Sequence, residues 1–466
     1  MSTPRLFWAA AVLALYALLC AVIALRHTRR QRAAQRHIDA LLGSPAVDAD
    51  LQWCVAHASQ TGQAEALALQ TAQALHAAGR PVRLLPLGAL RADELARTGH
   101  LLCVASTYGE GDAPDSAAAF VRHCMAREDI DLSHLCFGVL ALGDSDYARF
   151  CGFGRALDGW LRARGARPLF ERIEVDNADP AATGRWRDQL SLLTGHADLP
   201  DWQAPAYAPW QLVGCHLLNP GSTGQPLHHL VLRPAEGPLP EWQAGDLASI
   251  QPPHLARQAR DYSIASVPQD GALHLVVRTA RRPDGSPGRV SGWLTAPGRL
   301  GSTVPLCIRA HGGFRIGDNS ARPLLLIGNG SGIAGLRAHM RQRIAQAHAV
   351  GRGPRDTPPM WLVYGERQAA CDQVFPEETA RWHAEGWLQR VDRVFSRDGG
   401  RHRYVQHLLA DAADAVRDWA GRDGAIYVCG SRDGMGSEVD ATLRHILGEP
   451  LCQALEQQGR LRRDVY

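Results

Sequence analysis

Short apolar runs alternate with helical patterns between residues 46 and 197. Residues 51–58, 101–105 and 137–142 are apolar runs with the length of buried strands. A helical pattern follows the first run and continues to about residue 78. Strands that alternate with helices predict a doubly wound α/β domain, whose parallel sheet binds ligands beyond the carboxyl ends of its strands.

The pattern of apolar and polar residues after residue 199 indicates a different fold class. A link rich in Pro and Trp, PDWQAPAYAPW, precedes short strand-like segments that Gly and Pro interrupt, which predict a small antiparallel β-barrel. An apolar strand at 323–327 then enters a glycine-rich turn and a helix. We therefore expect an α/β multidomain protein. Its predicted parts are an N-terminal segment at 1–45, the doubly wound domain at 46–197, the barrel at 198–320 and an α/β domain at 321–466.

The N-terminal segment contains twenty consecutive uncharged residues, 6–25, enough to cross about 30 Å of hydrocarbon as a helix. Five arginines lie between residues 26 and 36, and only Arg5 precedes the run, so the positive-inside rule places the rest of the chain in the cytoplasm. A cleaved signal peptide is the alternative, although its apolar core is normally shorter. We expect a single-pass protein of the inner (cytoplasmic) membrane with cytoplasmic catalytic domains.

Composition excludes several classes of chemistry. With 466 residues, the chain has room for about three domains. All 50 basic residues are arginine, which excludes a lysine Schiff base and a phosphate loop that ends in lysine. The net charge of +3 does not indicate a nucleic-acid binder, although residues 46–195 alone carry a charge of −5. The 11 cysteines include no CxxC pair, so we expect neither a disulfide framework nor a metal site.

Three loops follow the strands of the first domain. Their sequences are SQTGQAE at 59–65, STYGEGDAPD at 106–115 and GDSDYARFC at 143–151. Hydroxyls and free N–H groups at a helix N-terminus can hold a phosphate, and the tyrosines of the other two loops can enclose a flat ring. The loops therefore suit FMN, whereas each loop taken alone could be a helix cap or an ordinary surface turn.

The second half carries its own ordered motifs. RDYSIAS at 260–266 and GRVSGWL at 288–294 offer a tyrosine for a flavin ring and groups for its pyrophosphate. GNGSGIAG at 328–335 is a pyrophosphate-binding turn between a strand and a helix. The chain then continues through IYVCG at 426–430 to its end at RDVY, 463–466.

Together these motifs resemble NADPH-dependent diflavin reductases, the family of the sulfite reductase flavoprotein subunit and the NADPH-haemoprotein reductases. The resemblance extends from about residue 50 to the C-terminus, and it implies a flavodoxin-like domain, an FAD-binding barrel and an NADP-binding domain of the ferredoxin-NADP reductase type. It implies FMN, FAD and NADPH as cofactors.

The resemblance also implies roles for individual residues. The catalytic residues are Ser263, Cys429 and Asp464. The FMN-binding residues are Ser59, Gln60, Thr61, Gly62, Gln63, Ala64, Ser106, Thr107, Tyr108, Gly109, Gly111, Leu142, Gly143, Asp144, Tyr147, Phe150 and Cys151. The FAD-binding residues are Arg260, Tyr262, Ser263, Val277, Arg278, Gly288, Arg289, Val290, Ser291 and Tyr466. The NADP-binding residues are Gly330, Gly332, Ser396, Arg397, His402, Tyr404, Gln406, Cys429 and Glu438.

The chain departs from the family pattern at several points. Only a short loop stands where the long reductases carry a helical connecting domain, so the resemblance leaves open how the FMN and FAD domains are placed. His402 occupies the position of a family lysine, and Gly335 that of a proline. NADPH preference over NADH is therefore expected but not fixed.

The resemblance implies that electrons pass from NADPH through FAD and FMN to an acceptor. With a membrane anchor, we expect the acceptor to be a haemoprotein or a ferric-iron complex at the membrane. A soluble sulfite reductase haemoprotein is the alternative acceptor. A tethered flavodoxin-like scaffold without turnover is the alternative of another class, and no nucleic-acid partner is expected.

Overall fold

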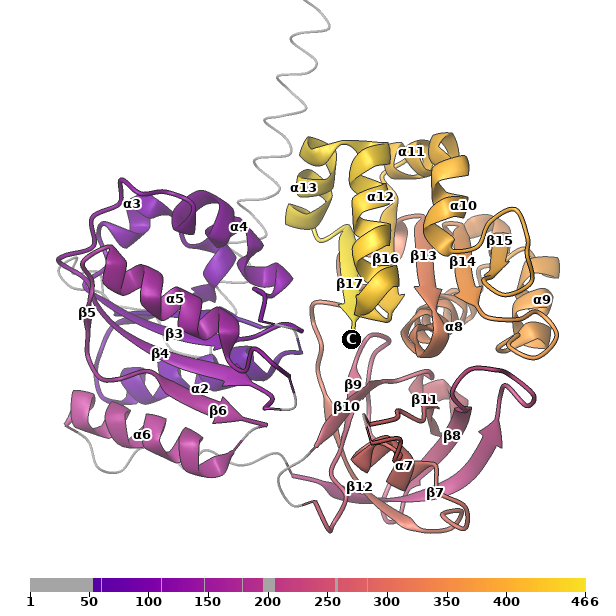
Figure 1. Ribbon diagram of the computed structural model, residues 1–466, viewed down its shortest axis with the longest axis horizontal. Helices are drawn as coiled ribbons and strands as arrows, with labels where there is room; N and C mark the ends of the chain where they lie inside the picture. The colour runs from indigo at the N-terminus through magenta and orange to yellow at the C-terminus, as the bar shows by residue number, and fades with distance from the viewer. Residues whose placement is uncertain are drawn as a thin grey trace, which may run out of the picture.

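The computed structural model describes residues 53–59, 61–109, 111–145, 147–177, 179–195, 206–255, 259–282 and 284–466, without the side chains of 432 and 433. The predicted span at 6–25 and the predicted FMN ligand Gln60 lie outside these residues. The described residues form three sheets (Figure 1). Within these ranges, no helix combines the length and the apolar character that a bilayer crossing requires.

The first sheet is parallel, as the alternation of strands and helices predicts. Its order is β2-β1-β3-β4-β5, and β6 also pairs with β4. Its strands are β1 (Trp53–Ala58), β2 (Val82–Pro86), β3 (His100–Ser106), β4 (Cys136–Gly143), β5 (Arg167–Pro168) and β6 (Ile173–Asp176). Its α-helices are α2 (Gln63–Ala77), α3 (Ala92–Leu95), α4 (Ala118–Phe120), α5 (Gly152–Ala163) and α6 (Pro180–Thr194). Two apolar clusters, one containing Phe137 and one containing Trp186, pack helices onto the sheet.

The second sheet is antiparallel and lies where the sequence predicts a barrel. Its order is β10-β9-β12-β7-β8-β11, and a bridge between Ile264 and Leu275 joins its two edges. Its strands are β7 (Ala208–Leu217), β8 (Leu227–Pro234), β9 (Leu247–Ile250), β10 (Arg260–Ser263), β11 (Leu273–Arg278) and β12 (Thr303–Arg309), with helix α7 at Arg289–Leu294. Alternate residues of these strands, such as Leu230 and Leu232, form one buried cluster.

The third sheet is parallel and has the order β15-β14-β13-β16-β17. Its strands are β13 (Leu324–Asn329), β14 (Met360–Glu366), β15 (Leu388–Phe395), β16 (Ala425–Gly430) and β17 (Leu461–Val465). Its α-helices are α8 (Ile333–Ala349), α9 (Pro376–Ala384), α10 (Val405–Asp411), α11 (Ala413–Gly421), α12 (Ser437–Leu447) and α13 (Glu449–Gln457). Its central strands β13, β14 and β16 are buried and contribute apolar residues to clusters on both faces, as expected for a parallel sheet covered by helices on both sides.

Short 3₁₀ or π turns complete the described elements. They are η1 (Leu87–Ala89), η2 (Asp115–Ala117), η3 (Val121–Met125), η4 (Pro268–Asp270), η5 (Gly317–Ala321), η6 (Gly330–Gly332), η7 (Pro354–Asp356) and η8 (Arg432–Gly436).

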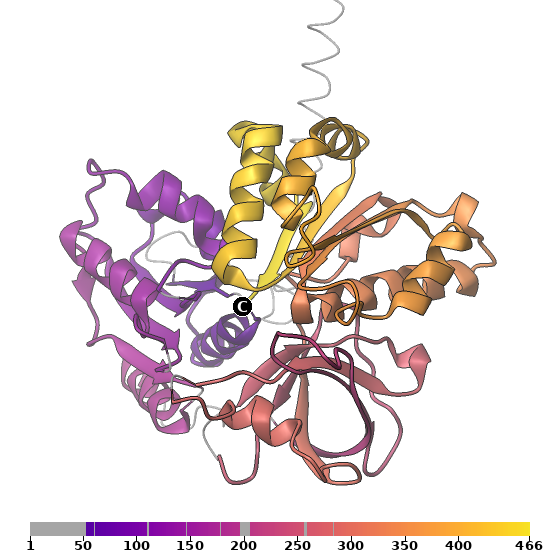
Figure 2. The same cartoon turned by 45° about the vertical axis from the view of Figure 1, so that its right-hand side comes forward.

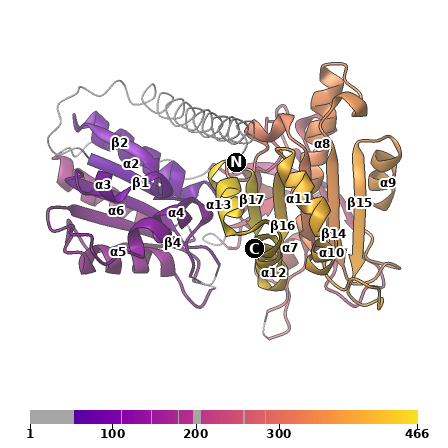
Figure 3. The same ribbon diagram turned by 90° about the horizontal axis from the view of Figure 1, so that it is seen from above.

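The C-terminus lies where the three sheets meet (Figures 1 and 2). Viewed from above, α13 and β17 form the side of the third sheet that faces α4 of the first (Figure 3). Because β17 is an edge strand, its outer backbone groups are available to this neighbour.

Candidate functional site

The first candidate site lies at the carboxyl ends of β1, β3 and β4. Loops from these three strands line a cavity of about 970 Å³. The predicted FMN residues that line it are Thr61, Gly62, Gln63, Ser106, Thr107, Tyr108, Gly109, Leu142, Gly143, Asp144, Tyr147, Phe150 and Cys151. Ser59, Ala64 and Gly111 are absent from this lining. Ala64 is instead buried in the core under α2, and Gly111 packs against Arg149.

The N-terminus of α2 is built to receive an anion. Gly62 precedes the helix with a φ of 81°, and no side chain caps the helix there. A Cβ at this position would lie 2.5 Å from the carbonyl oxygen of Ala310, so both the backbone angle and the close approach require glycine. The uncapped N–H groups of α2 therefore remain directed into the cavity.

Two buried hydroxyl groups beside this helix have no partner within the described part of the chain. They are Ser59 Oγ and Thr107 Oγ1. A buried hydroxyl without a hydrogen bond is costly, so these oxygens indicate a polar ligand. An uncapped helix start, spare hydroxyls and the ring of Tyr147, which is 44% exposed, fit a phosphate joined to a flat ring.

The second candidate site is a cavity of about 1400 Å³ between the second and third sheets. The predicted FAD residues that line it are Arg260, Tyr262, Ser263, Arg278, Gly288, Arg289, Val290, Ser291 and Tyr466. The predicted NADP residues that line it are Gly330, Ser396, Arg397, Tyr404, Gln406 and Glu438.

Four predicted ligands of this second site are placed elsewhere. Val277 points into the core of the antiparallel sheet. Gly332 packs against the carbonyl of Cys429, and Cys429 itself is fully buried behind the cavity. His402 pairs with Asp411 at 2.7 Å, outside the lining.

Positive charge dominates the second cavity. Three acidic residues line it, against eight arginines: 260, 278, 281, 282, 289, 367, 397 and 403. The sequence motifs did not indicate Arg281 or Arg282, which follow β11, whereas Arg367 ends the segment YGER at 364–367 and Arg403 is next to His402. The buried oxygen Oε1 of Gln406 has no hydrogen-bond partner in the described chain. This charge and this spare acceptor fit dinucleotides that carry several phosphates.

The three predicted catalytic residues meet at one carboxylate. The hydroxyl of Ser263 donates to Oδ2 of Asp464 at 2.6 Å, and Sγ of Cys429 lies 3.6 Å from the same oxygen. All three residues are buried. Burial, reinforced by the charge of Asp464, raises the pKa of the Cys429 thiol well above its ordinary value, so the thiol stays protonated.

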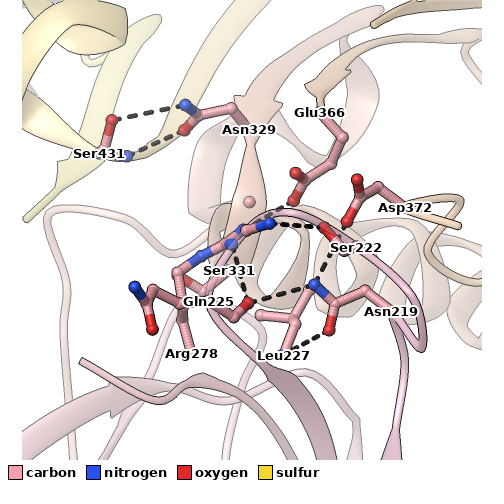
Figure 4. Close-up of polar contacts among 12 residues, drawn as sticks. Asn219, Ser222, Gln225, Leu227, Arg278, Asn329, Ser331, Glu366, Asp372 and Ser431 are labelled. Atoms are coloured by element: carbon pink, nitrogen blue, oxygen red, sulfur yellow. Dashed lines mark hydrogen bonds and ion pairs between the residues drawn. The ribbon is translucent and has the colours of Figure 1, made fainter. Parts of the chain in front are cut away.

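A polar network beside this group ties the second sheet to the third (Figure 4). Arg278 of β11 forms an ion pair of 2.7 Å with Glu366 at the end of β14. Burial raises the pKa of Glu366 in spite of this pairing. Asn329 of β13 accepts a hydrogen bond of 3.0 Å from the backbone N–H of Ser431, just beyond β16. The network fixes the strand ends around the glycine-rich turn.

The two cavities adjoin. The residues that line both are Tyr147, Arg260, Asp261, Ser263, Ser431 and Tyr466. Across this boundary, Arg260 forms an ion pair of 2.8 Å with Asp144 and donates to Asn177 at 3.2 Å. Arg309 of β12 similarly donates to the carbonyl of Thr61 at 3.2 Å. The sequence motifs contained neither Asn177 nor Arg309, since both contacts join elements that are far apart in the chain.

Comparison with known proteins agrees with this division into sites. The Flavodoxin family model matches residues 55–185, and the Oxidoreductase NAD-binding domain model matches residues 326–440. The chain is 25% identical to the sulfite reductase [NADPH] flavoprotein alpha-component of Neisseria meningitidis serogroup C, over 88% of this chain and 89% of that protein. It is 27% identical to the component of the same name from Vibrio cholerae serotype O1, over 92% and 86% of the two chains.

These findings correct the predicted membrane location. That prediction depended on one apolar run, at 6–25, which lies outside the described residues. The relatives that match most of the chain are sulfite reductase flavoprotein components. An inner-membrane location and a bilayer partner are therefore withdrawn.

Proposed function

Because the chain belongs to the NADPH-dependent diflavin reductase family, we propose that it is the flavoprotein component of a sulfite-reductase-type system. It is an NADPH-dependent flavoprotein oxidoreductase that uses FMN, FAD and NADPH. The proposed acceptor is a separate haemoprotein. The name shared by its relatives supports this acceptor over a haemoprotein or ferric-iron complex at a membrane.

In this proposal the first cavity holds FMN and the second holds FAD and NADPH. The bound flavins would accept a hydride from NADPH and release its electrons singly. The uncapped N-terminus of α2 receives the FMN phosphate, and the arginines of the second cavity neutralise the phosphates of the two dinucleotides. The proposed domains keep the limits 46–197, 198–320 and 321–466.

The proposed role of Asp464 is to hold its two neighbours in place at the reacting end of the second cavity. Its carboxylate fixes the hydroxyl of Ser263 and the thiol of Cys429, which come from two different sheets. Since the thiol stays protonated, Cys429 contributes a neutral, weakly polar surface and not a nucleophile. Of the three, only Ser263 lines the second cavity and would contact the nicotinamide, while Asp464 and Cys429 lie behind it and hold its hydroxyl in place.

The observation that carries the proposal is the set of six residues shared by the two cavities. A flavin in each cavity would lie beside the other, so electrons could pass between them within one chain. The chain would not need the connecting domain of the long reductases for this passage.

Reconstitution tests the proposed acceptor. The flavin-loaded protein would be mixed with the sulfite reductase haemoprotein from the same genome, and NADPH-dependent sulfide formation would be measured. We expect sulfide to form only when both proteins are present. Rapid cytochrome c reduction without any sulfide would refute this acceptor and leave the diflavin reductase assignment in place.

A further inference from the structure

Four consecutive residues at the end of the chain contact two different sites. Arg463 pairs with Asp115 of the first sheet's domain at 3.5 Å. Asp464 holds Ser263, as described above. The carbonyl of Val465 accepts a hydrogen bond of 2.7 Å from the hydroxyl of Tyr108. Successive residues of the strand therefore contact, in alternation, the FMN domain and the group of Ser263, Cys429 and Asp464.

The last residue lies at the boundary of the two cavities. The backbone N–H of Tyr466 donates to the carbonyl of Gly430 at 3.0 Å, and its hydroxyl donates to Oγ of Ser331 at 3.0 Å. Its side chain is 52% exposed and lines both cavities. The ring thus spans the gap between the end of β16 and the glycine-rich turn.

Tyr108 connects the two sites directly. It lies on the loop after β3 that lines the first cavity, and its ring packs against the buried cluster that contains Val465. Its hydroxyl bonds the residue between Asp464 and Tyr466, on the free edge of the third sheet. When the FMN domain is docked, this bond restrains the backbone that carries Tyr466.

We propose that docking of the FMN domain, through Tyr108 and Val465, holds Tyr466 in place and so opposes entry of the nicotinamide. The inference rests on the proposed function: Tyr466 and Ser263 both line the second cavity, so a nicotinamide that reaches Ser263 takes the place of the Tyr466 ring. Coupling between two sites is reciprocal, so a bound nicotinamide weakens docking of the FMN domain by the same factor. Tyr108 is in this sense a positioning residue for the NADP site.

The test compares two ligands on the oxidised, flavin-loaded chain by calorimetry. NADP⁺ must displace Tyr466, whereas 2′,5′-ADP has no nicotinamide and need not. Tyr108→Phe removes only the hydroxyl and keeps the ring. We expect it to tighten NADP⁺ binding about two- to tenfold, the effect of one lost hydrogen bond, and to leave 2′,5′-ADP binding unchanged. Asp115→Asn should act in the same direction but more weakly, because Arg463 also pairs with Glu456.

Tyr207→Phe is the matched control. The Tyr207 hydroxyl lies 3.2 Å from Ser249 Oγ, and both residues line the first cavity. This contact is with β9 of the second sheet and not with β17. We expect no change in the ratio of the two affinities. As a readout independent of ligands, hydrogen exchange at the Tyr466 amide should be faster in Tyr108→Phe than in the wild type.

Two results would overturn the inference: equal effects of Tyr108→Phe on both ligands, or wild-type affinities and exchange rates in that variant. Failure of the proposed function looks different. In that case wild-type protein would bind neither NADP⁺ nor 2′,5′-ADP, while the exchange measurement would still report on the contact between Tyr108 and Val465.

Discussion

At the scale of single residues, the carboxylate of Asp464 joins the two other residues that we propose to act in hydride transfer. It accepts one bond of 2.6 Å from Ser263 and lies near the thiol of Cys429. Hydrogen bonds to a charged acceptor are stronger than neutral ones, so this carboxylate fixes the Ser263 hydroxyl more firmly than an amide would.

Replacing this carboxylate by an amide tests its role. Asp464→Asn keeps the shape but removes the charge, and we expect FAD reduction by NADPH to slow about ten- to a hundredfold. Stopped-flow absorbance measures the rate, and the isotope effect with NADPH deuterated at C4 should rise as hydride transfer becomes limiting. Cys429→Ala should give a smaller decrease, with flavin content unchanged in both variants. A normal rate in Asp464→Asn would exclude the assigned role.

Motifs at strand ends placed several residues on cavity walls, while the ligands assigned to these residues stay predictions. Gly62, Tyr147 and Ser396 line the cavities because each belongs to a loop that follows a strand. The sequence could not indicate Arg309, whose contact with Thr61 exists only when two distant elements meet. The structure does not support the prediction that His402 binds NADP. Its imidazole pairs with Asp411 and does not line the cavity.

At the scale of elements, the periodicity of apolar residues predicted the two parallel sheets. In both, buried strands alternate with helices, and β1, β3, β4 and β13 fall close to the predicted apolar runs. The order of the strands could not be derived from periodicity, since each crossover depends on packing of the whole sheet. The same limit applies to the edge position of β17, on which the coupling through Val465 depends.

A histidine cluster lies where β8 and β11 meet α8 and α9. The rings of His229 and His274 are 4.9 Å apart, and His229 is also 5.2 Å from Phe375. Arg337 adds positive charge beside them, although it pairs with Glu378. Burial, followed by these neighbouring charges, lowers the pKa of both imidazoles to about 3.

The lowered pKa values of His229 and His274 predict that the histidine cluster makes the folded state less stable at acid pH. In the unfolded chain these imidazoles have a pKa near 6.5, so the unfolded state binds protons first. Their contribution to stability is complete above about pH 6.5 and is lost as the pH falls towards 3. His229→Gln should reduce the loss of unfolding free energy between pH 7 and pH 4, as measured by urea unfolding. A variant that loses stability as steeply as the wild type would contradict the assignment.

At the scale of the whole molecule, the three sheets converge on the C-terminus (Figure 2). The acidic FMN domain meets arginines of the other two parts, through Arg260 with Asp144 and through Arg463 with Asp115. The proposed haemoprotein acceptor would have to reach FMN at or near this same face. The FMN domain therefore could not be docked on its own chain and bound to the acceptor at the same time. Through Tyr108, nicotinamide binding would weaken docking and so favour contact with the acceptor.

The central claim is that one chain carries two adjoining flavin sites fed by NADPH. Flavins released by heat from the purified protein, quantified by chromatography together with NADPH-driven cytochrome c reduction, test it most directly. We predict one FMN and one FAD per chain with active reduction. FAD alone, or both flavins without reduction by NADPH, would contradict the account.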